Sequence, residues 1–384
     1  MAGRRQGPIR VLMLIESLDF DPGGAERLVV ALSTALPRER FDVTVCTTRD
    51  VEGPLLEQLR AAGVRHLALR RRTRADLWAW RRLTRFLREQ QVDILHAHMW
   101  GSNFWGTLLG RLSRVPVVIA HEHTWAYRGK PYRRLLDGYF IGRLATLFLT
   151  VANKELMVRW EHVPERKVEL MPNPYIPRSA TPGGDLRAEL GLSPEALVVG
   201  TAARLRPQKA LEVLLDAFAR VARSLDQAQL VIAGDGPCRE SLERRAAELG
   251  LAGRVHFIGM REDIDVVLRA FDVAAMSSSF EGSPLFAFEC MAHGRPLVAT
   301  AVGGLNDVFE HGRTALLVPP GDSEALAQAI EGLLRDPERR SALAAAARAK
   351  LEDYTIERVT ARYVELYESL LASGSPSPAP QPVT

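Results

Sequence analysis

Residues 197–233 read LVVGTAARLRPQKALEVLLDAFARVARSLDQAQLVIA, and this stretch decides the fold. A continuous apolar run at Leu197–Leu205 is followed by a proline turn, an amphipathic segment at Ala210–Ser224 and a second apolar run at Gln229–Ala233. Apolar runs without polar alternation are typical of strands that are buried on both faces of a parallel sheet. The stretch therefore predicts a β-α-β unit of a doubly wound α/β domain.

The same alternation of strand and helix extends over both halves of the chain. In the second half we expect further strands at Val255–Gly259, Asp272–Ser277, Pro296–Thr300 and Ala315–Val318, and helices at Arg239–Leu249, Ile264–Ala270, Pro284–His293, Asn306–Glu310 and Ser323–Leu334. In the first half we expect strands at Arg10–Ile15, Asp42–Thr47, His66–Ala68, Asp93–Ala97, Val117–His121 and Thr146–Val151, and helices at Ala25–Leu36, Pro54–Ala62, Leu77–Glu89, Asn103–Leu112 and Lys154–Glu161. Each half is therefore predicted to form a parallel sheet covered by helices.

The length of 384 residues suits two domains of ordinary size. Four prolines and two glycines within Met171–Gly184 mark a linker between them. We expect an N-terminal domain at 1–177, a C-terminal domain at 178–355, a C-terminal helix at 356–372 that crosses back to the N-terminal domain, and a disordered tail at 373–384.

Composition indicates a soluble protein of a reducing compartment. Hydrophobic residues make up 47% of the chain and charged residues 25%, and the three cysteines form no CxxC pair, which argues against disulfides and a zinc site. Glu16 and Asp19 interrupt the first apolar run, so we interpret that run as a strand and not as a signal peptide. Because no apolar run is long enough to span a bilayer, we expect a cytoplasmic location.

The two halves differ in charge. Residues 1–177 hold 28 Lys and Arg against 18 Asp and Glu, a net charge of +10, whereas the remaining residues have a net charge of −6. A basic half could attract nucleic acid, anionic lipid or a phosphorylated substrate, and composition does not choose among them.

In open parallel sheets ligands bind at the carboxyl ends of strands, so the loops that follow strands are the candidate sites. Glu281 lies in such a loop, Ser283 and Pro284 suit the cap and first residue of the next helix, and Glu289 lies within that helix. A helix N-terminus between two carboxylates would suit the phosphates and hydroxyls of a nucleotide sugar. Two solvated surface glutamates would give the same spacing.

Three more loops follow strands of the second half. Arg204 and Lys209 flank a proline turn and could contact a diphosphate, although two such residues are often only solvated. The Gly-Asp-Gly sequence at 234–236 favours a tight turn over nucleotide binding. Gly303 and Gly304 would allow a ligand to approach the backbone closely.

In the first half, Gly23 and Gly24 precede a helix and offer backbone amides to a phosphate. Two strands end in histidine pairs with i, i+2 spacing, so that each pair faces one side of its strand. These residues are His96, His98, His121 and His123. They could hold a metal, form structural hydrogen bonds, or provide one active-site histidine; no cysteine or acidic pair completes a standard metal set, although Glu122 is adjacent.

Together these motifs resemble those of a group 1 (family 4) retaining glycosyltransferase, over residues 8–372. They are GGAE (23–26), LHAH (95–98), EHT (122–124), ARLRPQK (203–209), AGDGP (233–237), EGSPLFAFE (281–289) and GGLNDV (303–308). The resemblance implies the α/β GT-B architecture, in which two Rossmann-like doubly wound domains face each other across a cleft. The chain departs from the family pattern at four places: Ala210 and Pro174 each replace a usual glycine, Asn153 replaces a common serine, and Asn306-Asp307 replaces a frequent proline-glutamate.

The resemblance also implies roles for the second-half residues. Glu281 would hold hydroxyls of the donor sugar and orient its anomeric carbon, and Glu289 would bind the ribose. Arg204 and Lys209 would neutralise the diphosphate as it leaves. Gly304 would be a further donor contact.

In the first half the resemblance assigns Gly23 and Gly24 to the donor phosphate. It places His123 near the donor sugar as a catalytic residue, and His121 is an additional histidine, so the choice between the two stays open. The activity implied is transfer of a sugar, with retention, from a UDP- or GDP-sugar to a glycan or lipid-linked acceptor in cell-surface polysaccharide synthesis. The leaving phosphate would accept the proton of the acceptor, so that no metal or other cofactor is implied. A sugar-nucleotide epimerase or hydrolase and a non-catalytic nucleotide-sugar-binding protein are the alternatives.

The acceptor-binding N-terminal domain contains two segments that mix basic and aromatic residues, Arg70–Arg88 and Tyr127–Leu149. Such helices favour peripheral contact with an anionic membrane, here the inner face of the plasma membrane, although a helix that covers a sheet would show the same apolar stripe. Because no nucleic-acid recognition motif accompanies the charge, we do not expect a nucleic-acid partner.

Overall fold

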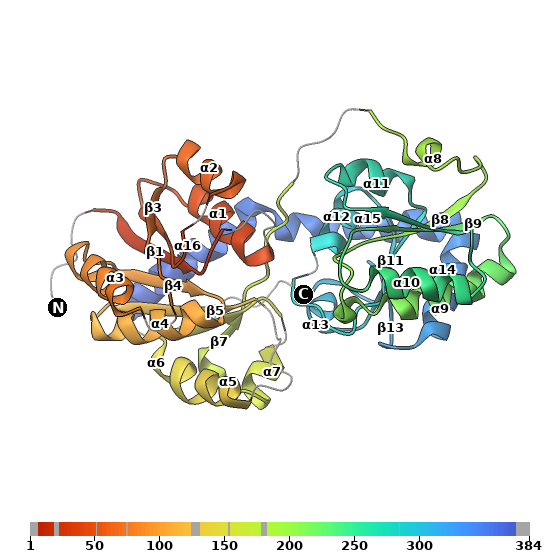
Figure 1. Ribbon diagram of the computed structural model, residues 1–384. Helices are drawn as coiled ribbons and strands as arrows, with labels where there is room; N and C mark the ends of the chain where they lie inside the picture. The colour runs from red at the N-terminus through yellow and green to blue at the C-terminus, as the bar shows by residue number, and fades with distance from the viewer. Residues whose placement is uncertain are drawn as a thin grey trace. The chain divides into compact units, whose positions relative to one another are not determined.

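The computed structural model describes residues 7–18, 23–50, 52–73, 76–123, 131–152, 154–177, 183–283 and 285–373. The chain divides into two compact units, shown in Figure 1: unit 1 comprises Met1–Ile176 and Tyr354–Thr384, and unit 2 comprises Pro177–Asp353. Asp19, the helix start expected at Pro284 and residues 374–384 of the tail expected at 373–384 lie outside the described residues, whereas Ser373 is the last residue of the C-terminal helix.

Unit 1 is built on a seven-stranded parallel sheet of order β3-β2-β1-β4-β5-β6-β7. The strands are β1 (Ile9–Ile15), β2 (Phe41–Thr47), β3 (Arg65–Ala68), β4 (Ile94–His98), β5 (Val117–Glu122), β6 (Leu147–Thr150) and β7 (Val168–Leu170). The helical elements are α1 (Gly24–Ala35), α2 (Pro54–Ala61), α3 (Leu77–Glu89), α4 (Trp100–Leu112), α5 (Pro131–Leu135), η1 (Leu136–Ile141), α6 (Gly142–Leu144), α7 (Lys154–Arg159), η2 (Glu165–Lys167) and the C-terminal α16 (Ile356–Ser373).

The side chains of β1 point alternately to two cores, as the period of a strand requires. Met13 packs with Leu28 of α1 and Tyr367 of α16 on one face of the sheet. Leu12 packs with Trp80 of α3 on the other face. Both faces are therefore covered, which explains why the strands read as uninterrupted apolar runs.

Unit 2 is built on a six-stranded parallel sheet of order β10-β9-β8-β11-β12-β13. The strands are β8 (Leu197–Ala202), β9 (Ala228–Ala233), β10 (Val255–Gly259), β11 (Val273–Met276), β12 (Leu297–Thr300) and β13 (Leu316–Val318). The helical elements are α8 (Leu186–Glu189), η3 (Pro207–Lys209), α9 (Leu211–Ser224), α10 (Arg239–Glu248), α11 (Ile264–Ala270), α12 (Leu285–Ala292), α13 (Gly303–Val308), α14 (Ser323–Arg335), α15 (Pro337–Leu351) and η4 (Glu352–Tyr354). The prediction of two Rossmann-like parallel sheets is thus confirmed.

Several elements differ from the expectation. Helix α4 begins at Trp100, three residues before the expected Asn103, and the short helices α5, α6 and α8 were not predicted. The three-residue strand β7 was not predicted, because so short a run has no readable period, and the π-helical η1 was missed between α5 and α6. Helix α13 begins at Gly303, three residues before the expected start. Strand β8 ends at Ala202 and not at Leu205, because the backbone beyond it packs against the glycine loop after β9. None of the described helices is both long and apolar enough to cross a bilayer.

Candidate functional site

The loop after β11 buries a carboxylate at the carboxyl edge of the second sheet. Only 4% of Glu281 is exposed. Its Oε1 accepts hydrogen bonds from Lys209 Nζ at 2.6 Å and from Ser278 Oγ at 2.5 Å. A buried carboxylate that is ion-paired and hydrogen-bonded is held in one position. Glu281 is therefore not a solvated surface charge.

The loop that carries Glu281 is joined to η3 by several hydrogen bonds. Ser277 Oγ donates to the Lys209 carbonyl at 3.0 Å, and the Ser279 amide donates to the Gln208 carbonyl at 2.9 Å. In return, Gln208 Nε2 donates to the Phe280 carbonyl at 2.9 Å. The loops after β8 and β11, which are far apart in sequence, therefore form one rigid edge.

The loop after β12 is fixed to the same edge. Thr300 Oγ1 donates to the Ser278 carbonyl at 2.6 Å, and the amide of Gly304 donates to the Glu281 carbonyl at 3.1 Å. Gly304 is thus brought next to Glu281, but its N–H is already used within the protein. Its contribution to a donor contact stays a prediction.

Arg204 and Lys209 both lie between β8 and α9, as expected. Arg204 is exposed, whereas the side chain of Lys209 is 23% exposed and pairs with Glu281. Ala210, which stands where the family has glycine, adopts a left-handed conformation with φ 45° and ψ 44°. That conformation favours glycine, which explains the family preference in terms of the turn into α9.

Glu289 is the fifth residue of α12 and is 8% exposed. Glu281 and Glu289 thus differ in setting, because one lies in the strand-end loop and the other on the following helix. Both are buried residues of unit 2, so they are not the two solvated surface glutamates that the spacing would also allow.

The glycine loop after β9 has a packing role. An added Cβ on Gly234 would lie 1.9 Å from the Ala203 carbonyl oxygen, and one on Gly236 would lie 2.5 Å from that of Leu205. Both glycines have positive φ, 125° and 156°. The loop therefore supports the backbone that leads to Arg204 and Lys209, which agrees with the interpretation as a tight turn.

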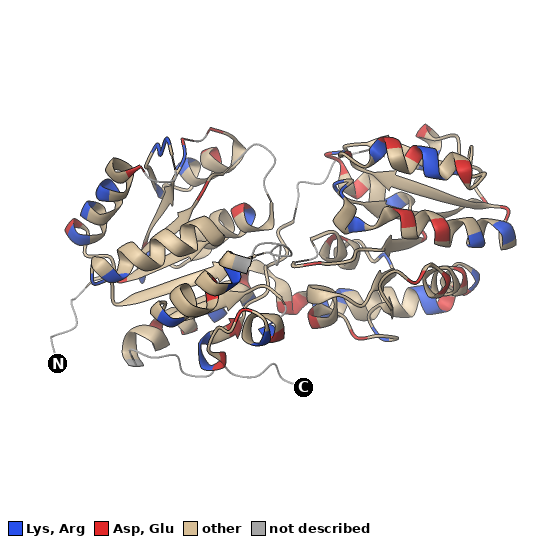
Figure 2. Ribbon diagram, turned by 60° about the horizontal axis from the view of Figure 1, so that its bottom comes forward, with Lys and Arg blue, Asp and Glu red and all other residues tan. Residues whose placement is uncertain are grey.

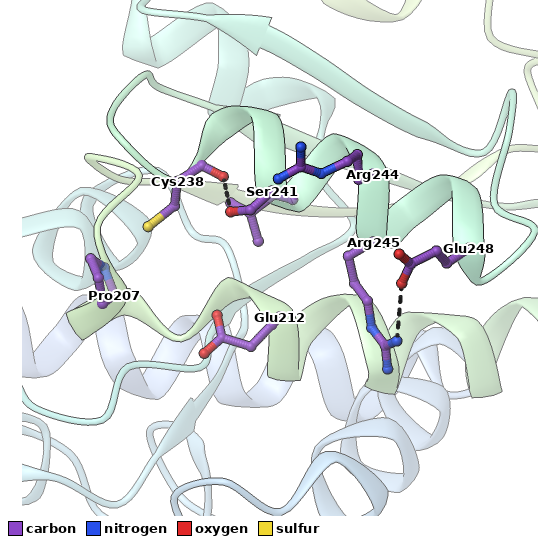
Figure 3. Close-up of a pocket in the computed structure, with 8 residues that line it drawn as sticks. Pro207, Glu212, Cys238, Ser241, Arg244, Arg245 and Glu248 are labelled. Atoms are coloured by element: carbon purple, nitrogen blue, oxygen red, sulfur yellow. Dashed lines mark hydrogen bonds and ion pairs between the residues drawn. The ribbon is translucent and has the colours of Figure 1, made fainter.

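An open groove of about 420 Å³ lies between α9 and α10 and is shown in Figure 3. Its lining includes Pro207 of η3 together with Cys238, Arg245 and Glu248, and Arg245 pairs with Glu248 at 3.4 Å. None of the residues assigned to the donor lines it. The groove therefore borders η3 but is not lined by Glu281 or Lys209.

In unit 1, Gly23 caps α1 and Gly24 is its first residue. The carbonyl of Gly23 accepts the amide of Arg27 at 3.3 Å. The glycine pair therefore lies at a helix start, as expected, while the residues from Asp19 to Pro22 of the same loop lie outside the described part.

Four histidines gather where β4 and β5 end, and all are buried. His96 Nε2 lies 3.2 Å from His121 Nδ1, and His98 Nδ1 lies 3.1 Å from His123 Nε2. His96 Nδ1 lies 2.7 Å from the hydroxyl of Tyr367, which comes from α16. Each histidine of β4 is thus hydrogen-bonded to a histidine at the end of β5, and not to its neighbour on the same strand. The C-terminal helix adds Tyr367 to the cluster.

Burial keeps these histidines neutral. It lowers the pKa of His96 and of His123 to about 3, and it holds the pKa of His98 and His121 well below the usual range. The neighbouring imidazoles lower the pKa of His96, His98 and His121 further. All four are therefore imidazoles and not imidazolium ions at neutral pH.

Nitrogen atoms of His96, His98 and His121 lie within 4.8 Å of one another, so the metal interpretation left open by the sequence has a geometric basis. The hydrogen bonds among the histidines, and from His96 to Tyr367, explain the short distances between these nitrogen atoms without an ion. Within the described ranges no carboxylate or thiol joins this group. Because hydrogen bonds already use nitrogen atoms of all three rings, we favour the hydrogen-bonded interpretation.

His121 and His123 differ in what holds them. The backbone of His121 is fixed by Asn103, whose side chain donates to its carbonyl at 3.1 Å and accepts its amide at 3.0 Å. His123 lies just beyond β5 and its amide donates to Glu122 Oε1 at 3.1 Å. Thr124 and the residues up to Lys130 lie outside the described part. The assignment of the active-site histidine stays a prediction.

A buried carboxyl that the sequence did not reveal lies on η1. Asp137 is 1% exposed, and burial together with Glu161 and Glu122 raises its pKa to about 9. It is therefore protonated at neutral pH, and a neutral carboxyl can donate a hydrogen bond. No spacing rule could have found it, because its neighbours come from other elements.

Two family models match this chain. The model described as glycosyltransferase family 4 matches residues 22–177, and the model described as glycosyl transferases group 1 matches residues 184–350. The alpha-D-kanosaminyltransferase of Streptomyces kanamyceticus is 31% identical over 294 residues, which are 70% of this chain and 74% of the relative. The chain therefore belongs to the group 1 (family 4) glycosyltransferases.

Other relatives agree with this assignment. The UDP-Gal:alpha-D-GlcNAc-diphosphoundecaprenol alpha-1,3-galactosyltransferase of Escherichia coli is 26% identical over 80% of this chain and 84% of the relative. The crystal structure of Anabaena Alr3699/HepE in complex with UDP and glucose matches with a TM-score of 0.80 at 22% identity, over 94% of this chain and 100% of that one. The likeness confirms the expected GT-B fold.

Proposed function

We propose that the protein is a retaining, metal-independent glycosyltransferase that moves a sugar from a nucleoside-diphosphate sugar to a glycan or lipid-linked acceptor in cell-surface polysaccharide synthesis. The observation that carries this proposal is the buried Glu281, which is paired with Lys209 and joined to the neighbouring strand-end loops. Family membership favours sugar transfer over the epimerase, hydrolase and binding-protein alternatives.

In the proposed reaction the donor binds unit 2. Glu281 accepts hydrogen bonds from sugar hydroxyls, while the cations of Lys209 and Arg204 neutralise the diphosphate as the glycosidic bond breaks. Lys209 and Glu281 form an ion pair with each other when no ligand is bound. When the donor binds, its diphosphate takes the place of Glu281 as the partner of Lys209, and its sugar hydroxyls take the place of Lys209 as the partners of Glu281. Glu289 binds the ribose, and His123 of unit 1, together with Gly23 and Gly24, contacts the donor.

Two relatives support the choice of donor and acceptor class. The HepE crystal contains UDP and glucose, and the name of the E. coli relative contains a UDP-sugar and a diphosphoundecaprenol-linked sugar. A UDP-sugar and a lipid-linked acceptor are thus the first pair to test, with GDP-sugars next. The leaving diphosphate accepts the acceptor proton, so neither a metal nor a protein base is required.

The test is a panel of UDP-, GDP- and ADP-sugars in the presence of EDTA. We expect one nucleotide class to raise the melting temperature, because a ligand that binds only the native state stabilises it. That sugar nucleotide should then be consumed faster when a lipid-linked acceptor is added, and the product should keep the anomeric configuration of the donor by NMR. Epimerised or acceptor-independent product, inversion, or loss of activity with EDTA would each refute the corresponding part of the proposal.

We propose further that the protein lies peripherally at the cytoplasmic, inner face of the plasma membrane through α3. Trp80, Leu83 and Leu87 of this helix are buried against the sheet, which accounts for most of its apolar stripe. Leu77 and Trp78 are 65% and 75% exposed. Arginines follow along the same helix, as Figure 2 shows, and Arg81 lies 5.6 Å from the Trp78 ring. An exposed tryptophan beside basic residues suits an anionic interface.

The membrane proposal predicts sedimentation with vesicles that contain phosphatidylglycerol, and release when the salt is raised from about 0.1 M to 1 M, where the Debye length falls from about 10 Å to 3 Å. Trp78→Ser should weaken binding by several-fold, whereas Met260→Ser, at a residue of unit 2 that is 73% exposed, should not. Equal binding of the two variants, or no binding at low salt, would refute the role of α3.

A further inference from the structure

His98, to which neither the motifs nor the comparisons give a role, is a direct partner of the proposed active-site histidine. His98 is the last residue of β4, and its backbone is in register with His121 of β5. Its Nδ1 lies 3.1 Å from Nε2 of His123, two residues beyond His121. Both residues are more than nine-tenths buried, so water does not compete for this contact.

The hydrogen bond between two imidazoles requires one donor and one acceptor. Both rings are neutral, because burial lowers the pKa of each well below neutrality. A neutral imidazole has one N–H and one lone pair, and the bond made by one nitrogen decides the state of the other. If His98 Nδ1 donates, His123 Nδ1 has the proton; if His123 Nε2 donates, His123 Nδ1 is an acceptor.

In either state, Nδ1 is the nitrogen of His123 that remains for a ligand. It is buried and has no hydrogen-bond partner among the described residues, and the same is true of His98 Nε2. The neighbouring pair is different, because His96 is also fixed by Tyr367. The tautomer of His123 therefore depends on His98 and not on the chain of contacts that runs to α16.

We propose that His98 is a positioning residue that fixes the tautomer and ring orientation of His123, so that Nδ1 of His123 meets the donor substrate in one hydrogen-bonding state. This inference rests on the proposed function, because it gives His123 a role in transfer. His98 itself does not touch the substrate. A misplaced contact group commonly lowers the rate by up to about 100-fold, which sets the scale of the expected effect.

Two substitutions at position 98 separate positioning from mere packing. An asparagine amide can occupy the place of imidazole Nδ1 and renew the bond to His123, whereas a glutamine amide reaches the place of Nε2 and cannot. We expect His98→Asn to keep turnover within about threefold of the wild type, and His98→Gln to lower kcat by about 10- to 100-fold with little change in the KM for the donor. Both variants should bind UDP as the wild type does.

The decisive readout is the imidazole ¹⁵N spectrum of the ligand-free protein with labelled histidine, with His123→Gln to identify the His123 signals. We expect His123 to show one protonated nitrogen and one bare nitrogen in the wild type and in His98→Asn, and an altered or mixed tautomer in His98→Gln. An unchanged His123 spectrum in His98→Gln, or equal loss of activity in both variants, would refute the inference. If His123→Gln itself leaves transfer unchanged, the proposed role of His123 fails, whatever the spectrum of His98→Gln shows.

Discussion

Replacement of Lys209 or Glu281 by alanine is expected to lower sugar transfer by about 100- to 1,000-fold, the usual cost of removing one group that stabilises transition-state charge. Lys209→Ala removes the cation that we propose to meet the leaving diphosphate. Glu281→Ala removes the proposed sugar contact and also leaves Lys209 without its partner at 2.6 Å. Glu281→Gln should lose nearly as much, although Ser278 can still donate to the amide oxygen.

The chain offers a matched control for both variants. Lys350 and Glu310 form an ion pair in unit 2 with the same length of 2.6 Å, and the lysine side chain is 24% exposed compared with 23% for Lys209. Lys350→Ala should therefore cost similar stability and no activity. Glu310 is 45% exposed compared with 5% for Glu281, so Glu310→Ala should cost less stability than Glu281→Ala and controls only for the loss of an ion pair. The initial rate of nucleoside-diphosphate release measures transfer, and circular dichroism checks the fold. Wild-type rates in Lys209→Ala or Glu281→Ala would contradict the assignment.

The stability of unit 1 is expected to fall steeply as the pH falls below about 6.5. The pKa of each buried histidine in the cluster is lowered in the folded state, so the unfolded chain binds more protons between the folded and unfolded pKa values, and acid favours unfolding. Asp137 acts in the opposite direction. Its pKa is raised to about 9, so the folded state binds the extra proton, and stability falls as the pH rises toward 9.

The two effects balance near pH 7, where about one proton is bound by the four unfolded histidines together. At pH 5.5 they predict a loss of roughly 3 to 4 kcal/mol for each further pH unit. All six tryptophans lie in the sequence of unit 1, so the midpoint of urea unfolding by tryptophan fluorescence reports on this unit.

A double variant, His96→Gln with His121→Gln, should reduce the slope at pH 5.5 to about a third, since two of the four titrating histidines are gone while Asp137 still opposes the remaining two. His256→Gln is the control, because this histidine belongs to unit 2. If the urea midpoint of the wild type does not change between pH 5 and pH 7, the pKa values of the four histidines are not lowered by folding, and the prediction is wrong.

The strands and their arrangement in covered parallel sheets could be predicted, because uninterrupted apolar runs such as Leu197–Ala202 are typical of strands buried on both faces. The order of the strands within each sheet was not predicted. The edge strand β7 and the π-helical η1 could not be predicted. Gly138 of η1 packs so closely on the Glu161 carbonyl that an added Cβ would lie 1.9 Å from it, a tertiary constraint that leaves no period in the sequence.

The candidate residues of the site could be located because strand ends are readable, but their partners could not. Lys209 and Glu281 are 72 residues apart, and their ion pair depends on how the loops after β8 and β11 meet. The bond between His98 and His123 likewise requires that β4 and β5 be neighbours in the sheet. Spacing therefore identified the groups, and only the fold assigned them to one another.

Hydrogen–deuterium exchange with and without the stabilising sugar nucleotide tests the central claim most directly. The proposed site predicts slower amide exchange at 203–210 and 277–289 of unit 2 when the donor is bound, and this protection should disappear in Glu281→Ala but persist in Glu310→Ala. Protection that spares both segments, or that survives in Glu281→Ala unchanged, would contradict the assignment of the donor to the Glu281–Lys209 edge.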